Sequence, residues 1–371
     1  MNADGLFNPS RLTLARKRRG LTMTKLAAQV GLELRSISAY EKGEFKPEAE
    51  RLAAIAGVLR FPEAFFFGDD LDEPTPDVAS FRSLSKMTAG QRDTALGAGA
   101  MALLFNDWME VRFDLPQAEL PDLSREASPE AAAQELRRAW GIGELPIKNM
   151  IHLLEAKGVR VFSLALDAAE VDAFSMWRQS TPYVFLNTKK SAEHGRFDAA
   201  HELGHLVLHR HGSPQGRAAE QEANAFASAL LMPRASVLAQ APRIPTLEHL
   251  IRLKKFWSVS LAALTYRLHA VGAISDWHYQ TLFVELSSRG YRKKEPDEGQ
   301  RETSQVLQKV FAALREEGVS RASIARELCI PAEELDQLVF GLALTVLSGS
   351  AGAEPATRAK GANLRVVPSQ G

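Results

Sequence analysis

Apolar residues over positions 10–68 recur at the three- and four-residue spacing of short amphipathic helices. This spacing predicts four helices. Thr22 can cap the second helix, and Gly31 ends it. The third helix runs to Tyr40, and the fourth covers 49–59. The pattern therefore predicts a compact bundle of short helices at the N-terminus.

The pattern becomes mixed over residues 129–235. Helical spacing predicts helices at 129–140, 147–157, 191–210 and 217–231, and β-branched and aromatic runs predict strands at 159–164, 171–178 and 183–187. Such a mixture predicts an α+β unit with a small sheet beside its helices. Residues 244–345 return to helical spacing, with caps expected at Thr246 and Ser320.

Composition indicates a folded, water-soluble protein. The chain has 371 residues, of which 45% are hydrophobic and 24% are charged, a balance typical of globular domains. No apolar run reaches the roughly 18–20 residues of a membrane span, and the N-terminus lacks the apolar core of a signal peptide. We therefore expect a cytoplasmic protein with no membrane partner. The single cysteine, Cys329, excludes a disulfide framework, so a metal would need histidine and carboxylate ligands.

The distribution of charge is more informative than its total. Lys plus Arg and Asp plus Glu both number 45, which gives a net charge of zero. Residues 1–60 nevertheless carry a net charge of +5, from eleven basic and six acidic side chains, and residues 61–80 carry six acids and no base. A basic head followed by an acidic stretch is typical of a DNA-contacting module that leads into a linker. Chance clustering on a solvated face is the alternative.

Two of the predicted N-terminal helices are joined in the way that a helix-turn-helix requires. Ala27 is small where the two helices approach, and Ile37 supplies an inward apolar anchor. The second helix would enter the major groove of DNA while the first crosses the phosphate backbone. Arg35 suits a bidentate contact to guanine, whereas the two lysines suit phosphates. The candidate DNA-binding residues are Arg35, Ser36, Ser38, Lys42 and Lys46.

The segments RLTLARKRRGLT, ISAYEKG and FPEAFFF carry a resemblance to a known family. They make residues 10–68 similar to Xre-type helix-turn-helix domains, which are of the Cro and phage-repressor kind. The resemblance implies that double-stranded DNA is a partner. The alternative interpretation is a small helical bundle without DNA-binding function.

The run His201-Glu202-Leu203-Gly204-His205 is the sharpest chemical signal in the sequence. Helical residues four apart are offset by only about 40° and by about 6 Å along the axis, so both imidazoles can reach one cation. Glu202 then lies beside the metal, where it can hold and deprotonate a water molecule. His201 and His205 are therefore candidate metal ligands, and Glu202 is the candidate catalytic base. Gly204 permits close approach of a neighbouring helix.

A catalytic zinc needs a third protein ligand and an open fourth position. The predicted helix at 217–231 offers two acids near its apolar face. Glu220 flanks that face, Asn224 follows four residues later on the same side, and Glu222 lies on the other flank. Glu220 is the preferred ligand and Glu222 the alternative, while Asn224 would orient a ligand imidazole. Three further histidines are expected to lie on the surface, namely His194, His209 and His211.

The segments RFDAAHELGHLVLH and EQEANAFASALLMP resemble the two hallmark segments of the ImmA/IrrE family of zinc peptidases. The similarity extends over about residues 130–290. It implies a gluzincin-like fold, Zn²⁺ held by two histidines and one glutamate, and hydrolysis of a peptide bond in a protein substrate such as a transcriptional repressor. Arg196 lies where family members keep a basic residue, and a structural ion pair is expected there. A substrate strand could pair along the predicted strand 183–187, taken as a sheet edge.

The patterns together predict a mainly α chain with a small α+β, zincin-like (gluzincin-like) domain and an N-terminal helix-turn-helix bundle. The expected parts are a DNA-binding domain at 1–70, a linker and connector helix at 71–128, a zinc peptidase domain at 129–243, a helical extension at 244–300, a small C-terminal helical module at 301–348 and a disordered tail at 349–371.

The expected function is a DNA-binding transcriptional regulator whose zinc metalloendopeptidase domain cleaves a regulatory protein. The alternative is a transcription factor or antitoxin-like repressor whose zinc domain is sensory or inactive. The C-terminal module is a candidate for partner contact or dimerisation, so a homodimer is a further expectation.

Overall fold

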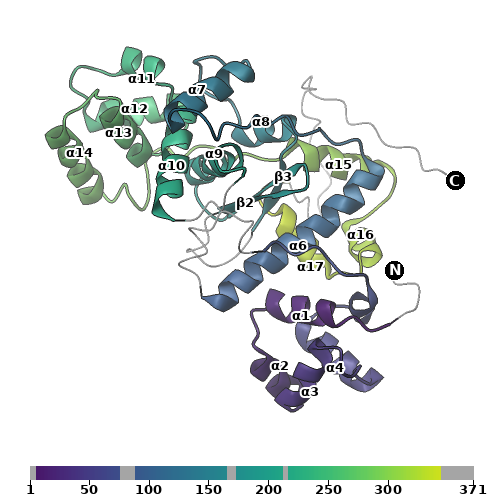
Figure 1. Cartoon of the computed structure of the whole chain (residues 1–371). Coiled ribbons are helices and arrows are strands. Elements are labelled where there is room, and N and C mark those ends of the chain that lie inside the picture. The colour runs from purple at the N-terminus through teal and green to yellow at the C-terminus, as the bar shows by residue number, and fades with distance from the viewer. Residues whose placement is uncertain (1–5, 76–87, 165–172, 212–215, 344–371) are drawn as a thin grey trace, which may run out of the picture.

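The computed structural model describes residues 6–75, 88–164, 173–211 and 216–343 (Figure 1). The expected tail at 349–371 lies outside these residues, as do positions 76–87 of the expected linker and the first two positions of the strand expected at 171–178. Within the described residues the chain folds into α-helices and a single three-stranded sheet. The expected fold class, mainly helical with a small α+β unit and an N-terminal helical bundle, is confirmed.

The N-terminal bundle contains the four expected short helices and one further 3-10 helix. They are α1 (Pro9–Arg18), α2 (Met23–Val30), α3 (Leu34–Glu41), α4 (Ala49–Leu59) and the 3-10 helix η1 (Glu63–Phe67). The Thr22 side chain accepts a hydrogen bond from the Lys25 backbone N–H and so caps α2. Gly31 ends α2 in the left-handed region, with φ of 67°, which glycine adopts without a steric penalty. Ala27 and Ile37 are buried between the helices, as expected.

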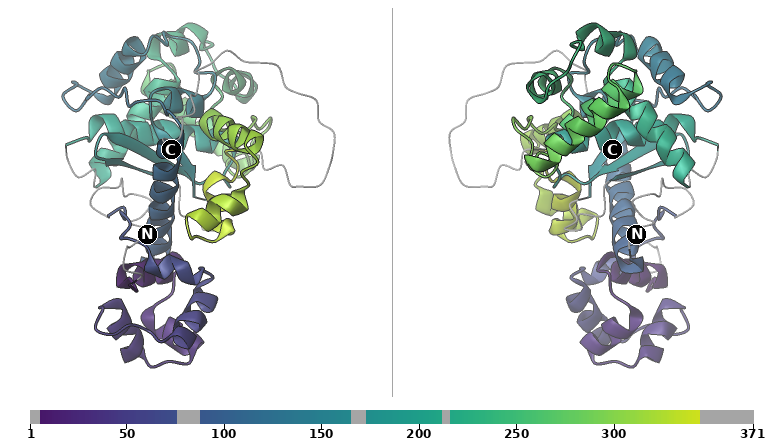
Figure 2. Two further views of the ribbon diagram at one scale, coloured as in Figure 1. Left: turned by 90° about the vertical axis from the view of Figure 1, so that its right-hand side faces the viewer. Right: turned by 90° about the vertical axis from the view of Figure 1, so that its left-hand side faces the viewer.

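Helix α6 (Ala89–Arg112) is the connector between the N-terminal bundle and the rest of the molecule. Thr88 and Gln91 form a reciprocal capping box at its start, which satisfies two backbone donors. Figure 2 shows α6 as the stem that joins the bundle to the larger part of the protein. Its contact with α1 is close, because a Cβ atom added at Gly97 would lie 3.1 Å from the Arg18 Cα.

The sheet has the strand order β1-β3-β2, formed by β1 (Arg160–Ser163), β2 (Ala173–Arg178) and β3 (Thr181–Leu186). Strand β1 pairs with β3 in parallel, and β2 pairs with β3 in antiparallel. The expectation that 183–187 is a sheet edge is therefore wrong. Strand β3 uses its backbone groups on both sides, because β2 returns beside it as a hairpin while β1 arrives on its other side, so β3 cannot pair with a substrate strand.

The helices of this part are α7 (Pro129–Ala139), α8 (Met150–Ala156), α9 (Ala192–Leu208) and α10 (Arg217–Leu231), of which α8 and α9 contact the sheet. Helix α9 packs on β2 and β3 through its apolar side, and α10 packs against α9 and α7 (Figure 1). Gly204 makes the approach of α9 and α10 possible, as expected. A Cβ atom at Gly204 would lie 3.0 Å from Cδ1 of Phe226 and 3.3 Å from Cα of Ala223, both on α10.

The remaining helices are α11 (Arg234–Gln240), α12 (Leu247–Trp257), α13 (Leu261–Ala270), α14 (Asp276–Ser288), α15 (Gln305–Glu316), α16 (Arg321–Glu327) and α17 (Ala332–Val339). The caps expected at Thr246 and Ser320 are present as capping boxes. Helix α17 packs back onto α6 and β1. In Figure 2 the C-terminal helices lie beside the α6 stem. Among the described helices, none combines the length and hydropathy needed to cross a bilayer.

Candidate metal centre and nucleic-acid interface

Helices α9 and α10 bring three potential metal ligands together. His201 and His205 lie one turn apart on α9, and Glu220 lies in the first turn of α10. The ligand atoms of these three residues all lie within 4.8 Å of one another. The two imidazole Nε2 atoms are 3.1 Å apart, and they lie 3.3 Å and 3.4 Å from the carboxylate oxygens of Glu220. Glu222, the alternative ligand, is not part of this group.

The spacing of these atoms fits a zinc ion. Zinc binds histidine nitrogen and carboxylate oxygen at about 2.0–2.2 Å in tetrahedral geometry, so its ligand atoms should lie about 3.4 Å apart. The observed separations of 3.1–3.4 Å are close to that value. Three protein ligands, rather than four, match the number typical of catalytic zinc sites, in which a fourth position serves water or substrate.

Electrostatics keep the Glu220 carboxylate ionised. Burial raises the pKa of Glu220, but hydrogen bonds from His201 and His205 outweigh burial and bring it down to about 2. For His201, burial lowers the pKa, but the hydrogen bond with Glu220 and the negative charges of Glu202 and Glu220 leave it above the usual value. Zinc binds deprotonated ligands, so the ionised Glu220 is ready to coordinate a metal, whereas His201 has to release the proton that it shares with Glu220.

The side chains around the cluster orient its imidazoles. Asn224 Oδ1 lies 3.1 Å from Nδ1 of His201, the ring nitrogen that faces away from the cluster. His209 Nδ1 lies 3.0 Å from the equivalent nitrogen of His205, and Glu222 Oε2 lies 2.9 Å from Nε2 of His209. The expectation that His209 is a surface histidine is therefore wrong. Its ring lies on the same face of α9 as His205, one turn further along, and only 12% of its side chain is exposed.

Glu202, the candidate catalytic base, is buried between α9 and the sheet. The hydroxyl of Ser175 on β2 donates a hydrogen bond of 2.7 Å to its Oε2 atom. The sequence contains no signal for this contact, because a serine within a strand belongs to no spaced motif. Arg196 forms the expected structural ion pair, with Glu302, and also donates to the Ile147 carbonyl.

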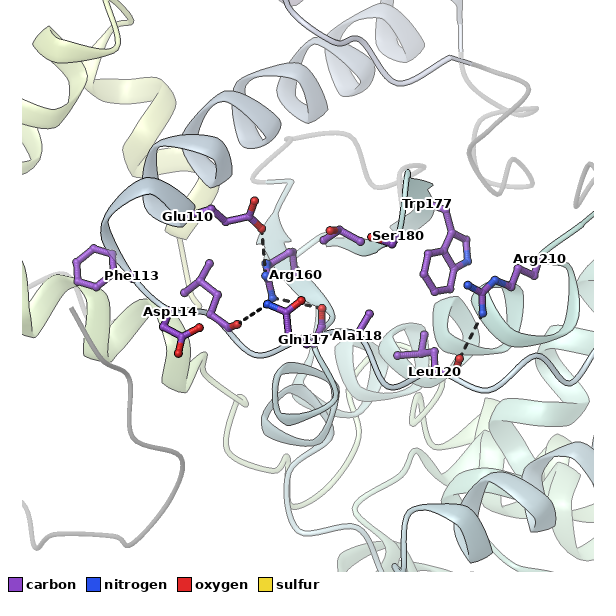
Figure 3. Close-up of a pocket in the computed structure, with 13 residues that line it drawn as sticks. Glu110, Phe113, Asp114, Gln117, Ala118, Leu120, Arg160, Trp177, Ser180 and Arg210 are labelled. Carbon is purple, nitrogen blue, oxygen red and sulfur yellow. Dashed lines mark hydrogen bonds and ion pairs between the residues drawn. The ribbon is translucent and has the colours of Figure 1, made fainter. Parts of the chain in front are cut away.

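A cavity of about 650 Å³ lies beyond the end of α9 (Figure 3). It is lined by the end of α6 and the residues after it, by the starts of β1 and β3, and by Trp177 and Arg210. The Arg210 guanidinium lies over the Trp177 ring, 4.2 Å from its centroid, which is a cation–π contact. No residue of the metal-ligand cluster lines this cavity.

The candidate DNA-binding residues lie on or beside α3. Arg35 is 84% exposed and forms an ion pair of 2.5 Å with Glu33. Glu33 occupies the N-cap position of α3, but its side chain makes no capping hydrogen bond. Ser36 and Ser38 are half-buried, whereas Lys42 and Lys46 are exposed after the helix. The structure thus presents one arginine and two lysines to solvent at this face of the bundle.

Comparison with known proteins assigns both regions. Residues 12–66 match a family model described as helix-turn-helix, and residues 154–269 match a peptidase family model described as IrrE N-terminal-like domain. Two curated relatives, from Sinorhizobium medicae and Rhizobium meliloti, are each named an uncharacterized HTH-type transcriptional regulator. Each is 38% identical to this chain over 60 residues, which is 16% of this chain and 43% of the relative.

The chain thus spans less than half the length of the curated relatives that it matches. The helices α1 to α4 and η1 coincide with the helix-turn-helix match, and the sheet with α9 and α10 lies inside the second match. The protein therefore carries an Xre-type helix-turn-helix domain at its N-terminus and, over residues 154–269, an IrrE N-terminal-like domain of the ImmA/IrrE peptidase kind.

Proposed function

We propose that this protein is a cytoplasmic DNA-binding transcriptional regulator. Its gluzincin-like domain is, in this proposal, a zinc-dependent endopeptidase that cleaves a regulatory protein such as a repressor. The observation that supports the peptidase most directly is the convergence of His201, His205 and Glu220 next to the buried carboxylate of Glu202. The match of the surrounding residues to a peptidase family model supports the same reaction.

The roles of the residues follow from their positions. His201, His205 and Glu220 would hold the zinc ion, which when bound supplies Lewis acidity to a peptide carbonyl. Glu202 is one residue from His201 and is the general base that takes the proton of the attacking water and passes it to the leaving nitrogen. The Ser175 hydroxyl fixes the Glu202 carboxylate against the sheet through its bond to Oε2, and so limits the directions in which Glu202 can exchange a proton.

The N-terminal bundle supplies the DNA-binding function. Helix α3 is the recognition helix in this proposal, with Arg35 reading a base edge in the major groove and Lys42 and Lys46 contacting phosphates. Ser36 and Ser38 lie on the same short helix and are suited to hydrogen bonds with bases or phosphates. The relatives' printed description as HTH-type transcriptional regulators supports this role.

The test of the peptidase is the Glu202→Gln variant, which keeps the shape of the side chain and removes the base. The zinc-loaded protein is incubated with a repressor encoded beside its gene, and cleavage is followed by mass spectrometry. We expect cleavage by the wild type and at least a hundredfold slower cleavage by Glu202→Gln, with zinc content and DNA affinity unchanged. Glu248→Gln, at an exposed glutamate of α12, is the matched control and should cleave normally.

Two outcomes would contradict the proposal. Equal cleavage by the wild type and Glu202→Gln would remove Glu202 from the reaction. A wild type that binds zinc and DNA and represses transcription, but cleaves none of the repressors tested, would favour a regulator whose zinc domain is sensory or inactive.

A further inference from the structure

The two histidines of the ligand cluster are supported from outside in different ways. His201 meets an amide, because its Nδ1 atom lies 3.1 Å from Asn224 Oδ1. His205 meets another imidazole, because its Nδ1 atom lies 3.0 Å from Nδ1 of His209. His209 in turn meets a carboxylate, with 2.9 Å between its Nε2 atom and Oε2 of Glu222.

The positions of the protons along this chain follow from the partners at its ends. A carboxylate can only accept a hydrogen bond, so Nε2 of His209 donates to Glu222. Nδ1 of a neutral His209 is then the acceptor, so Nδ1 of His205 must carry the proton and donate to it. When a metal binds, His205 therefore keeps its Nδ1 proton and gives up only the proton of Nε2, the atom that lies 3.1 Å from His201 and 3.4 Å from Glu220.

We propose that His209 and Glu222 act together as positioning residues for His205: they fix its tautomer and ring orientation and so present its Nε2 lone pair to the metal. This inference rests on the proposed zinc site and adds residues to it for which the expected roles were a surface histidine and an alternative ligand. Histidine ligands hold a metal more tightly when their second ring nitrogen donates a hydrogen bond to an acceptor that fixes the ring.

The contacts from His205 through His209 to Glu222 form a hydrogen-bonded relay. This relay lies at the contact between α9 and α10. Glu220 and Glu222 are two residues apart on α10, so they lie on opposite flanks of the helix. Between those flanks, Ala223 packs against Gly204 of α9. Glu220 therefore reaches α9 on one side of this contact, at His201 and His205, and Glu222 reaches it on the other side, at His209. The packing of α9 against α10 thus positions both the candidate ligand Glu220 and the supporting residue Glu222.

The neighbouring His211 shows what a surface pair looks like in the same segment. His211 is 68% exposed and pairs with Asp122, and none of its described contacts involves the ligand cluster. His209, by contrast, is 12% exposed and touches His205 directly. The two residues therefore form a matched pair for mutation.

The test measures metal affinity in the full-length protein. His209→Ala removes the acceptor, whereas His209→Asn keeps an acceptor oxygen near the position of Nδ1. Glu222→Gln keeps the size of the carboxylate but not its charge. His211→Ala is the control. Zinc affinity is measured by competition with a chromophoric chelator, and the site geometry is followed by the visible absorption of bound Co²⁺.

We expect His209→Ala to weaken zinc binding by about 10–100-fold and to change the Co²⁺ spectrum. His209→Asn should recover part of the affinity, Glu222→Gln should weaken binding less than His209→Ala, and His211→Ala should match the wild type. Affinity and spectrum of His209→Ala equal to those of the wild type would overturn the relay.

A second measurement does not depend on metal binding. Imidazole ¹⁵N shifts of the metal-free wild type should show His209 with its proton on Nε2 and His205 protonated at Nδ1, and a proton on Nδ1 of neutral His209 would overturn the relay. If the wild type binds neither zinc nor cobalt, the proposed metal site fails, whereas the ¹⁵N result still decides the relay. The ¹⁵N result also decides it if His209→Ala does not fold.

Discussion

Glu334 on α17 accepts a hydrogen bond of 2.7 Å from Nε of Arg18, a residue at the end of α1 that lies 316 positions earlier in the chain. The second carboxylate oxygen of Glu334 pairs with Arg19 at 2.5 Å. The Glu334 side chain is fully buried, and α17 also packs on α6 and β1. Helix α17 therefore ties the N-terminal bundle to α6 and to the sheet, so the α6 stem is not the only link between them.

Replacement of Glu334 by Ala should loosen this connection. It would leave the buried Arg18 and the adjacent Arg19 without their shared carboxylate, and removal of one partner from a buried ion pair costs about 3–5 kcal/mol. We expect faster hydrogen exchange and faster proteolysis around α1 and α17. Glu333→Ala, at an exposed position on the same helix, is the control and should change stability by less than about 0.5 kcal/mol. Equal exchange in the two variants would show that the pair does not hold the bundle in place.

Much of the candidate metal-ligand cluster could be predicted from sequence because it depends on local spacing. The helix expected at 217–231 is present with these bounds as α10. The four-residue spacing of His201 and His205 was enough to place both imidazoles together, and the apolar face of α10 was enough to favour Glu220 over Glu222. In each case the helical repeat fixes the geometry.

The features that the sequence analysis missed depend on which elements become neighbours in space. Strand spacing shows that 183–187 is a strand but not that β1 and β2 enclose it. The role of His209 depends on Glu222 of another helix, and that of Ser175 on its position opposite Glu202. The pairing of Glu334 with Arg18 joins the two ends of the chain. A charged residue whose partner is this distant leaves no periodic signal.

Mutations on α3 and directly after it should separate base recognition from phosphate contact. Arg35→Ala should weaken binding to the cognate operator by about 1–3 kcal/mol and relax its specificity, because a bidentate guanine contact is lost. Lys42→Ala should weaken binding to all sequences and reduce the salt dependence by about one phosphate contact. Fluorescence anisotropy against salt concentration measures both effects. Lys255→Ala on α12, an exposed control, should bind as the wild type does, and an Arg35→Ala variant with full specificity would exclude the base contact.

Glu155 should make stability depend on pH. Burial raises its pKa to about 7, although hydrogen bonds from Ser304, Val306 and Gln305 oppose this rise. The pKa of Glu155 in the folded protein exceeds the unfolded value of 4.5. The contribution of Glu155 to the stability of the fold is therefore complete below about pH 4.5 and is lost as the pH rises through about 7.

The raised pKa of Glu155 corresponds to a loss of about 3 kcal/mol of folding stability between about pH 4.5 and about pH 7. Urea unfolding at pH 5 and pH 7.5 should therefore show a loss of stability that is much smaller in Glu155→Gln, which cannot ionise. The control variant Glu248→Gln, at an exposed glutamate, should keep the loss. If Glu155→Gln retains the full pH dependence, another group causes it.

Substitution of two glycines of α9 by alanine should change the stability of the protein in opposite directions. At Gly195 an added Cβ atom would meet no atom within 4 Å, so Gly195→Ala should stabilise the helix by about 0.5–1 kcal/mol through the better helix propensity of alanine. At Gly204 the same atom would lie 3.3 Å from the Cα of Ala223 and 3.0 Å from Phe226. Gly204→Ala should therefore push α10 away and destabilise the protein by roughly 1–3 kcal/mol. Since α10 carries Glu220, zinc affinity should fall with Gly204→Ala and stay unchanged with Gly195→Ala. Thermal unfolding and chelator competition on both variants measure these effects, and unchanged zinc affinity in Gly204→Ala would show that the close approach of the helices does not set the position of the ligand.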